Sequence, residues 1–259
     1  MSDSFVNAPG HASALRELGF LTRAEGDGVV VGEAPITPEM WVPGTQVLRM
    51  SVLAIWADIV AGHLAAFSQA PRIPITLDLD VHLFRQPVGT GTVTARASLV
   101  KVGRSVVVTR VDLTLDGRPL GISGGQFMVS PDPEHLAPDG FDVNSPGPRL
   151  HLEVPFADRV GAVRIGPGVA EVPRRLETMN ATGSLQGGLV ALAVEEAVLA
   201  GAPGEVLTSI SLRYLRPYRE GPARATAELS DGVAVVDVTD AGTGKLGSWV
   251  SARYEPAAG

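Results

Sequence analysis

The sequence predicts an α+β fold made from two copies of one structural unit. In each half, a long apolar helix-forming segment is followed by short runs rich in β-branched residues, which is typical of an antiparallel meander. The helix-forming segments, residues 46–67 and 185–200, are apolar on nearly every face. A helix of that kind is buried on all sides. A curved sheet wrapped around the helix satisfies both patterns.

The elements of the first half follow in a simple order. A helical opening (residues 14–20) and a strand (28–34) precede the long helix. Four runs with strand character come after it, and several of them alternate apolar with polar residues. These runs are 75–85, 91–102, 105–117 and 119–129.

The second half repeats this order. We expect an N-terminal unit over residues 1–131, a linker rich in Pro, Asp and Gly over 132–149, and a C-terminal unit over 150–259. LFRQP (83–87) in the first half is echoed by YLRPY (214–218) in the second. The expected elements are a strand at 169–177, the helix, and strands at 206–217, 223–230, 233–240 and 245–256.

Composition limits the classes of function. The chain has 259 residues, of which 45% are hydrophobic and 19% charged, so it can bury a large core. A net charge of −7 argues against a nucleic-acid surface. Without cysteine, thiolate metal sites are excluded, and the five histidines show no metal-ligand spacing. We expect a cytoplasmic protein with no metal, no cofactor, no nucleic-acid partner and no membrane span.

The stretch NATGSLQGG, residues 180–188, opens the second helix. It resembles the N-x-x-G-x-x-H-G-G signature of the acyl-CoA thioesterase superfamily, in the phenylacetyl-CoA thioesterase-like branch, with Gln186 where the family usually has His. The resemblance covers both halves. It implies a tandem, or double, hotdog fold, in which two curved antiparallel sheets each wrap a long central helix, and it implies an acyl-CoA substrate.

Thioester hydrolysis needs hydrogen-bond donors aimed at the carbonyl oxygen as it becomes an oxyanion. Gly187 and Gly188 lie where the second helix should begin, so their N–H groups have no acceptor within the helix. The resemblance assigns a further donor, the side-chain amide of Asn180. We expect Asn180 and Gly187 to form the oxyanion hole, with Gln186 and Gly188 as secondary candidates.

The reaction also needs a group that activates water. Glu195 lies eight residues beyond Gly187 (195 − 187), roughly 12 Å along the same helix, so it cannot reach a carbonyl held at Gly187. The acid should therefore come from the first half. Aligning the two helices places Asp58 at the position of Glu195, and the resemblance points to Thr76 as a helper. We expect Asp58 to act as general base or nucleophile, with Glu195 the secondary candidate.

The first half lacks the donors of the second. Pro43 stands where the second half has Asn180, Arg49 where it has Gln186, and Met50-Ser51 where it has Gly187-Gly188. The sequence therefore predicts one composite site, built from an acid of the first half and donors of the second. The corresponding site at the other end of the helix pair should be inactive.

Several alternatives stay open. The glycine pair could serve a close helix-to-strand packing contact, Asp58 could face solvent, and Thr76 could be an ordinary strand residue. Arg213 and Arg216 could bind the phosphates of coenzyme A or be surface charges. A non-catalytic acyl-thioester binding protein remains possible. A hotdog hydratase is disfavoured because its D-x-N-P-x-H or H-F-P-type segments are absent. Association into a homodimer of double hotdogs is left open.

Overall fold

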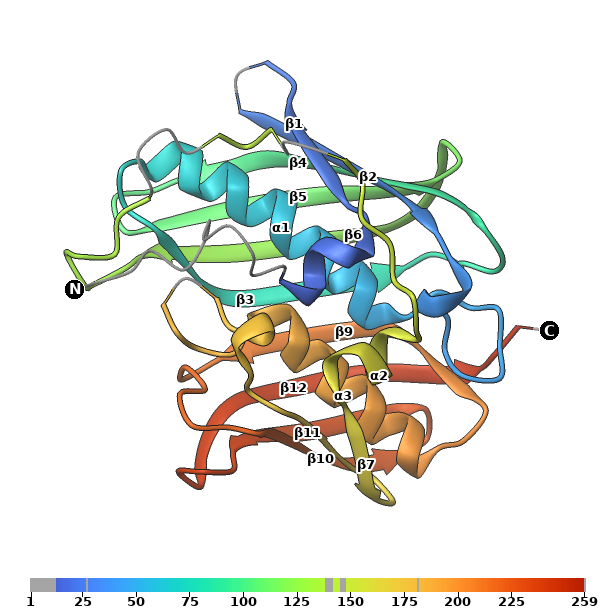
Figure 1. Cartoon of the computed structure of the whole chain (residues 1–259). Coiled ribbons are helices and arrows are strands. Elements are labelled where there is room, and N and C mark those ends of the chain that lie inside the picture. The colour runs from blue at the N-terminus through green and yellow to red at the C-terminus, as the bar shows by residue number, and fades with distance from the viewer. Residues whose placement is uncertain (1–12, 27, 138–141, 145–147, 181, 259) are drawn as a thin grey trace.

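One continuous sheet of twelve strands forms the back of the molecule in a computed structural model of the chain (Figure 1). The structure describes residues 13–26, 28–137, 142–144, 148–180 and 182–258. Parts of the expected linker, 138–141 and 145–147, lie outside the described residues. The strand order is β1-β2-β4-β5-β6-β3-β9-β12-β11-β10-β8-β7. Each half contributes six consecutive strands to this order, so the two units share one sheet.

In the first half, the sheet wraps the helix α1 (Met50–Gln69). Thirteen of its residues are buried, which explains why a helix of this length carries so little polar surface. By length and composition α1 could also cross a membrane, but 67% of that apolar window is buried inside the fold. The other elements are the 3-10 helices Ala14–Leu18 and Pro38–Met40, and the strands β1 (Leu21–Ala24), β2 (Val29–Ile36), β3 (Pro74–Leu83), β4 (Gly91–Val102), β5 (Val106–Leu115) and β6 (Arg118–Val129).

The second half repeats the arrangement around the helix α3 (Gly187–Gly201). Its residues Gly188 to Leu199 are all buried. The other elements are α2 (Phe156–Val160), the 3-10 helix Leu176–Thr178, and the strands β7 (Val163–Gly166), β8 (Val169–Val172), β9 (Glu205–Tyr214), β10 (Ala223–Ser230), β11 (Val233–Asp240) and β12 (Lys245–Pro256).

The two halves are joined through β3 and β9. These strands pair antiparallel, with Asp78 opposite Arg213 and His82 opposite Ser209. The strand order reads the same from either edge once each strand is exchanged for its counterpart in the other half. The halves are therefore related by a pseudo-twofold axis between β3 and β9. This symmetry confirms the expected α+β tandem hotdog fold.

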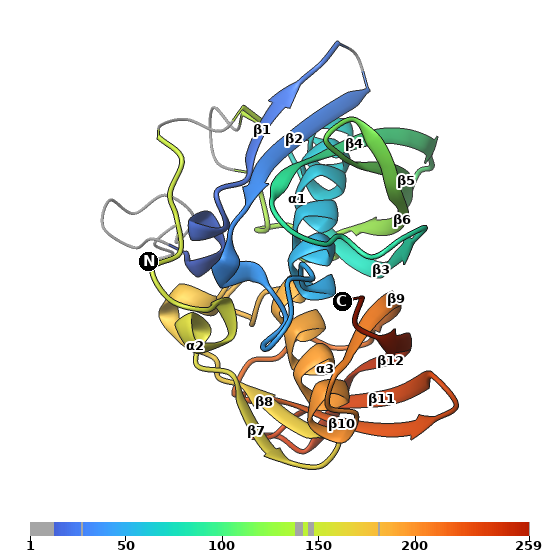
Figure 2. The ribbon, with the colours of Figure 1, turned by 90° about the vertical axis from the view of Figure 1, so that its right-hand side faces the viewer.

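Both helices lie on the same face of the sheet, and α1 contacts α3 directly (Figure 2). The inward-facing strand residues, such as Leu79 and Leu212, are fully buried beneath them. One connected apolar core runs through both halves. The N-terminal end of each helix is thereby brought toward the middle of the other, which is the arrangement that a composite site requires.

The elements differ from the expectations mainly at short segments. The first helix begins at Met50 rather than at residue 46, because Val47 forms a β-bridge with Val88. The expected strand 169–177 ends at Val172 and is followed by a 3-10 turn. The short strands β1 and β7 and the helix α2 were not expected, since four or five residues give too weak a periodic signal.

Candidate active site

Asp58 and Thr76 lie together, as the sequence suggests. The Thr76 hydroxyl donates a hydrogen bond of 3.1 Å to Oδ1 of Asp58. Asp58 sits in the middle of α1 and is partly buried. Burial raises the pKa of Asp58 to about 6, and the hydrogen bond from Thr76 opposes that rise in part. A carboxylate with this pKa is suited to exchanging protons near neutral pH.

A β-bulge turns Thr76 toward Asp58. Between Thr76 and Asp78, β3 carries one residue more than its partner β6, so Thr76 pairs with the buried Phe127 while Asp78 pairs with Gln126. In an uninterrupted strand, Thr76 would share the face of Asp78. The bulge moves Thr76 to the inner face, and bulges of this kind often re-aim a side chain beside a functional site.

The start of α3 offers backbone donors. Gln186 is the N-cap and Gly187 the first helical residue, and within the described part of the chain the Gly187 N–H has no acceptor. The Tyr214 hydroxyl holds the Gly187 carbonyl at 3.0 Å. The Gln186 side chain is tied back, since its Nε2 donates to Ser13 Oγ and to the Met179 carbonyl, each at 3.1 Å.

Gly188 has a different role. A Cβ at this position would come within 2.4 Å of the Ile55 side chain on α1, so only glycine lets the two helices approach this closely. Gly188 therefore serves close packing, but against a helix and not against a strand as the alternative had it. At Gly187, a Cβ would approach the Tyr214 hydroxyl at 3.3 Å, a tighter contact than most side chains make.

Asn180 is fixed by its own loop. Its Oδ1 accepts hydrogen bonds from the backbone N–H groups of Thr182 (3.0 Å) and Ser184 (3.1 Å). The Thr182 hydroxyl adds a third at 2.8 Å. Because all three groups donate hydrogen bonds, the atom that they contact must be the amide oxygen. The other atom is the Nδ2 nitrogen, which can donate. Nδ2 has no hydrogen-bond partner among the residues that the structure describes.

Glu195 and Glu196 lie in a buried ionic cluster at the other end of the helix pair. Arg49 Nη1 contacts Glu195 Oε2 at 3.1 Å and Glu196 Oε1 at 2.6 Å. Glu195 also accepts from the Met50 N–H and from the Ser51 hydroxyl, each at 2.7 Å. Both glutamates are thus structural, and Glu195 is held at the start of α1, away from Gly187.

The pseudo-symmetry allows the ionic cluster to be compared, position by position, with the candidate site. Glu195 is the counterpart of Asp58, and Met50 is the counterpart of Gly187, with a common offset of 137 residues (195 − 58 and 187 − 50). Glu195 reaches the Met50 N–H directly. Aspartate is one methylene shorter, and Asp58 makes no such bond to Gly187 among the described residues. It lies near Tyr214, which holds the Gly187 carbonyl. An acid near a backbone donor that has no partner is what a reaction site requires.

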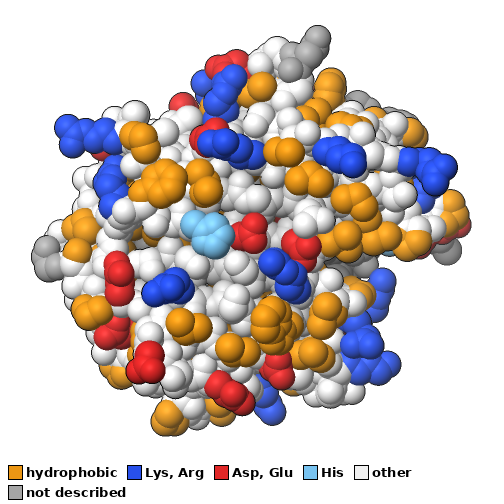
Figure 3. Space-filling view, turned by 180° about the vertical axis from the view of Figure 1, so that it is seen from behind, with side chains coloured by type: hydrophobic (Ala, Val, Ile, Leu, Met, Phe, Trp, Pro, Cys, Tyr) orange, Lys and Arg blue, Asp and Glu red, His pale blue; other side chains and the backbone are white. Residues whose placement is uncertain are grey.

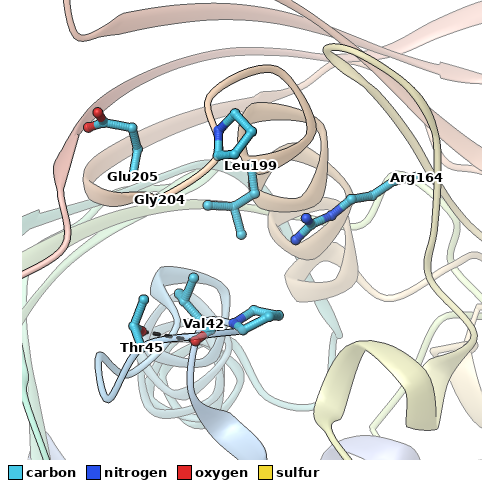
Figure 4. A pocket seen from close by; sticks show the side chains of 8 residues that line it. Val42, Thr45, Arg164, Leu199, Gly204 and Glu205 are labelled. Atoms are coloured by element: carbon cyan, nitrogen blue, oxygen red, sulfur yellow. Dashed lines mark hydrogen bonds between the residues drawn. The ribbon is translucent and has the colours of Figure 1, made fainter.

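A pocket of about 140 Å³ lies at the Glu195 end of the helix pair, the end that is expected to be inactive (Figure 4). Pro43, the counterpart of Asn180 (180 − 137), and Leu199 are among its lining residues. Arg164 also faces the pocket, and its Nε donates to Glu196 at 2.7 Å. Where the second half offers a side-chain amide, the first half has a proline ring without a donor. The inactivity of this end stays a prediction.

The two arginines suggested for phosphate binding lie elsewhere. Arg213 is on the outer face of the sheet, because the preceding Leu212 points into the core. It pairs with Asp78 at 3.4 Å and Asp80 at 3.7 Å. Figure 3 shows this face, on which acidic and basic side chains are interspersed. The alternative of an ordinary surface charge is favoured for Arg213. Arg216 is exposed and donates to the Leu246 carbonyl at 3.1 Å.

Tyr214 is a member of the site that sequence reasoning missed. In the sequence it appears only as the first residue of the echo YLRPY (214–218). Burial raises the pKa of Tyr214 well above its ordinary value, and the nearby charge of Asp58 raises it further. Tyr214 therefore remains a hydrogen-bond donor to Gly187. Alternation along β9 could have placed it on the inner face, two residues after the buried Leu212.

Part of the first half matches a known protein family. Residues 50–122 match the family model of the thioesterase superfamily. This match covers α1 and most of the first meander. It confirms the resemblance to hotdog thioesterases. The match also supports assignment to the thioester hydrolases. No curated protein matches the chain in a sequence comparison. Among described residues, no group of three or more His, Asp or Glu could hold a metal ion.

Solved structures share the fold over nearly the whole chain. An acyl-ACP thioesterase from Bacteroides thetaiotaomicron is 13% identical, covers 87% of this chain and 98% of its own, and has a TM-score of 0.59. The 12:0-ACP thioesterase from Umbellularia californica is 12% identical (87% and 94% covered, TM-score 0.60). A hot dog fold protein of unknown function from Alicyclobacillus acidocaldarius is 15% identical (95% and 98% covered, TM-score 0.60).

Proposed function

We propose that this chain hydrolyses acyl-CoA thioesters at the composite site between α1 and α3. The observation that carries the proposal is the contrast between the two ends of the helix pair. At one end, Glu195 closes onto the Met50 N–H. At the other, the shorter Asp58 is bonded to Thr76 instead, and the Gly187 N–H has no acceptor among the described residues, which leaves both groups for a thioester carbonyl and a water.

In this proposal the donors of the second half stabilise the oxyanion. The Gly187 N–H stands at the positive end of α3, and the Nδ2 of Asn180 is the second donor. The Gln186 carbonyl accepts a hydrogen bond from the Leu189 N–H at 3.0 Å, which fixes the Gln186–Gly187 peptide and orients the Gly187 N–H before substrate arrives. The Tyr214 hydroxyl holds the next peptide through the Gly187 carbonyl. Donors that need no rearrangement contribute most to such stabilisation.

Asp58 supplies the base. The Thr76 hydroxyl occupies Oδ1, which leaves Oδ2 to accept a proton from water. The water oxygen attacks the carbonyl carbon, and its proton passes to Asp58. When the C–S bond breaks, the same proton passes to the leaving thiolate, which gives the free acid and the thiol. Alternatively, Oδ2 attacks directly and the resulting anhydride is hydrolysed by water.

Thiol release from a panel of acyl-CoA esters tests the proposal. Catalytic release of free coenzyme A is expected. The competing role is non-catalytic binding of an acyl thioester. The observation that favours this role is Gln186, which stands where the family usually has His. That role would show as saturable binding of acyl-CoA, measured by calorimetry, with no thiol release, and this result would contradict hydrolysis. Parallel assays with acyl carrier protein thioesters define which carrier is preferred.

A further inference from the structure

Gly62 lies one helical turn beyond Asp58 on α1 (62 − 58 = 4), so the two residues share one face of the helix. Glycine inside a helix costs stability compared with alanine, because it gives up more conformational freedom. A glycine in the middle of a 20-residue buried helix therefore needs a reason.

Close packing is not that reason. A Cβ at Gly62 would meet only one atom of the described residues, Cε1 of Phe127, at 3.7 Å, which is an ordinary contact distance. Gly188, in contrast, has the Ile55 side chain at 2.4 Å. The backbone at Gly62 thus borders space that a side chain could fill, and Gly62 itself is only partly buried.

This space is next to the candidate site, and the side chain beneath it, Phe127, is apolar. Phe127 is 1% exposed and is the cross-strand partner of Thr76, which contacts Asp58. Gly125 leaves room for the Phe127 ring, because a Cβ at Gly125 would come within 2.8 Å of it. Gly62 and Phe127 therefore lie next to the Asp58–Thr76 pair, between α1 and the sheet.

The inactive end shows what happens when this space is filled. The counterpart of Gly62 is Leu199 (62 + 137), which is 3% exposed and lines the pocket beside Pro43 (Figure 4). At the candidate site, the same two positions hold Gly62 and Asn180. The chain thus carries leucine where the acid is locked in an ion pair, and glycine where it is open.

We propose that Gly62 is a specificity-determining residue, and that the acyl group of the substrate packs over its backbone. This inference rests on the proposed function. The coenzyme A end carries charged phosphates and must stay in water, whereas the bare backbone of an apolar helix, with the buried Phe127 beneath it, suits an alkyl or aromatic acyl group. A side chain at position 62 would compete with the acyl group for the same space.

The test is a chain-length profile of thiol release from acetyl-, butanoyl- and octanoyl-CoA. Gly62→Leu should lower kcat/KM for octanoyl-CoA relative to acetyl-CoA by at least about tenfold, since removing or adding a few methylenes to an apolar pocket has effects of this size. Gly62→Ala should change the ratio less. It should also raise Tm by roughly 2 °C, because alanine is the better helix former.

Leu199→Ala is the matched control at the inactive end. It should lower stability through the cavity it leaves, with the octanoyl-to-acetyl ratio unchanged. A folded Gly62→Leu protein with the ratio of the wild type would overturn the inference, as would an equal change in Leu199→Ala.

Binding separates this inference from the proposed hydrolysis. Octanoyl-CoA binding is measured by calorimetry for Asp58→Asn and for the same variant carrying Gly62→Leu. If the wild type releases no thiol but Gly62→Leu weakens octanoyl-CoA binding about tenfold, hydrolysis is wrong and the acyl pocket stands. Equal binding by the two variants overturns the acyl pocket even if the wild type is an active hydrolase.

Discussion

At the scale of single residues, the acids at the two ends of the helix pair differ by one methylene. Glu195 reaches the backbone donor of the opposite helix, and Arg49 neutralises it. Asp58 has no cation within salt-bridge distance among the described residues, so burial governs its pKa. The same position in the two copies thus holds a structural acid at one end and a titratable acid at the other.

The pH dependence of activity follows from the ionisation of Asp58. The carboxylate form is the base or nucleophile, so kcat/KM should rise with pH and reach half its plateau near pH 6. Thiol release measured from pH 4.5 to pH 8 checks this. A profile that stays flat down to pH 4.5 would exclude an acid with this pKa from the rate-limiting chemistry.

The same ionisation affects stability. The pKa of Asp58 rises on folding from its ordinary 3.8 to about 6, so the folded state binds the proton more tightly. The protonated acid makes its whole contribution to the free energy of unfolding below pH 3.8. This contribution is lost as the pH rises through about 6. Asp58→Asn should therefore gain stability relative to wild type between pH 4.5 and pH 7.5. Urea unfolding at both pH values measures the difference, and an equal ΔΔG at the two would refute it.

Asn180 is predicted to act on the transition state. Asn180→Ala removes the Nδ2 donor, and loss of one such donor lowers kcat about 10²- to 10³-fold. KM should change much less, because the donor acts mainly on the developing oxyanion. Steady-state kinetics separate the two parameters. Thr182→Ala is a control that removes only one of three hydrogen bonds to the Asn180 oxygen, and it should retain most activity.

At the scale of elements, the contact between α1 and α3 depends on the ionic cluster. Arg49→Ala would leave Glu195 and Glu196 buried with Arg164 as the remaining cation, which contacts Glu196 alone. Removing one partner of a buried ion pair costs about 3–5 kcal/mol. Chemical denaturation should show this loss. A loss below about 1 kcal/mol would mean that the cluster is solvated.

The elements also show how far sequence reasoning reaches. The two long helices and both meanders follow from apolar periodicity and β-branched composition, and these signals depend only on local sequence. The β-bulge that aims Thr76 at Asp58 depends on pairing with β6, and the tie from Tyr214 to Gly187 depends on a strand and a helix 27 residues apart. Such contacts carry no local signature.

At the scale of the whole molecule, duplication lets the two ends of the helix pair diverge. In the fold, Asp58 comes from the first half and Gly187 from the second, so neither half holds both groups of the candidate site. The sequence predicted this division because Pro43, Arg49 and Met50 replace the donors of the second half. It did not predict the ionic cluster, since Arg49 and Glu195 are 146 residues apart and their meeting depends on how α1 and α3 pack.

The division of labour between the halves is tested most directly by thiol release from octanoyl-CoA by two variants, Asp58→Asn and Glu195→Gln. Removal of a general base typically costs about 10²- to 10⁴-fold in rate. We predict that folded Asp58→Asn loses activity by this factor, whereas Glu195→Gln loses stability but keeps its rate at a temperature where it is folded. Wild-type activity in Asp58→Asn, with loss in folded Glu195→Gln, would contradict the assignment of Asp58 as the working acid.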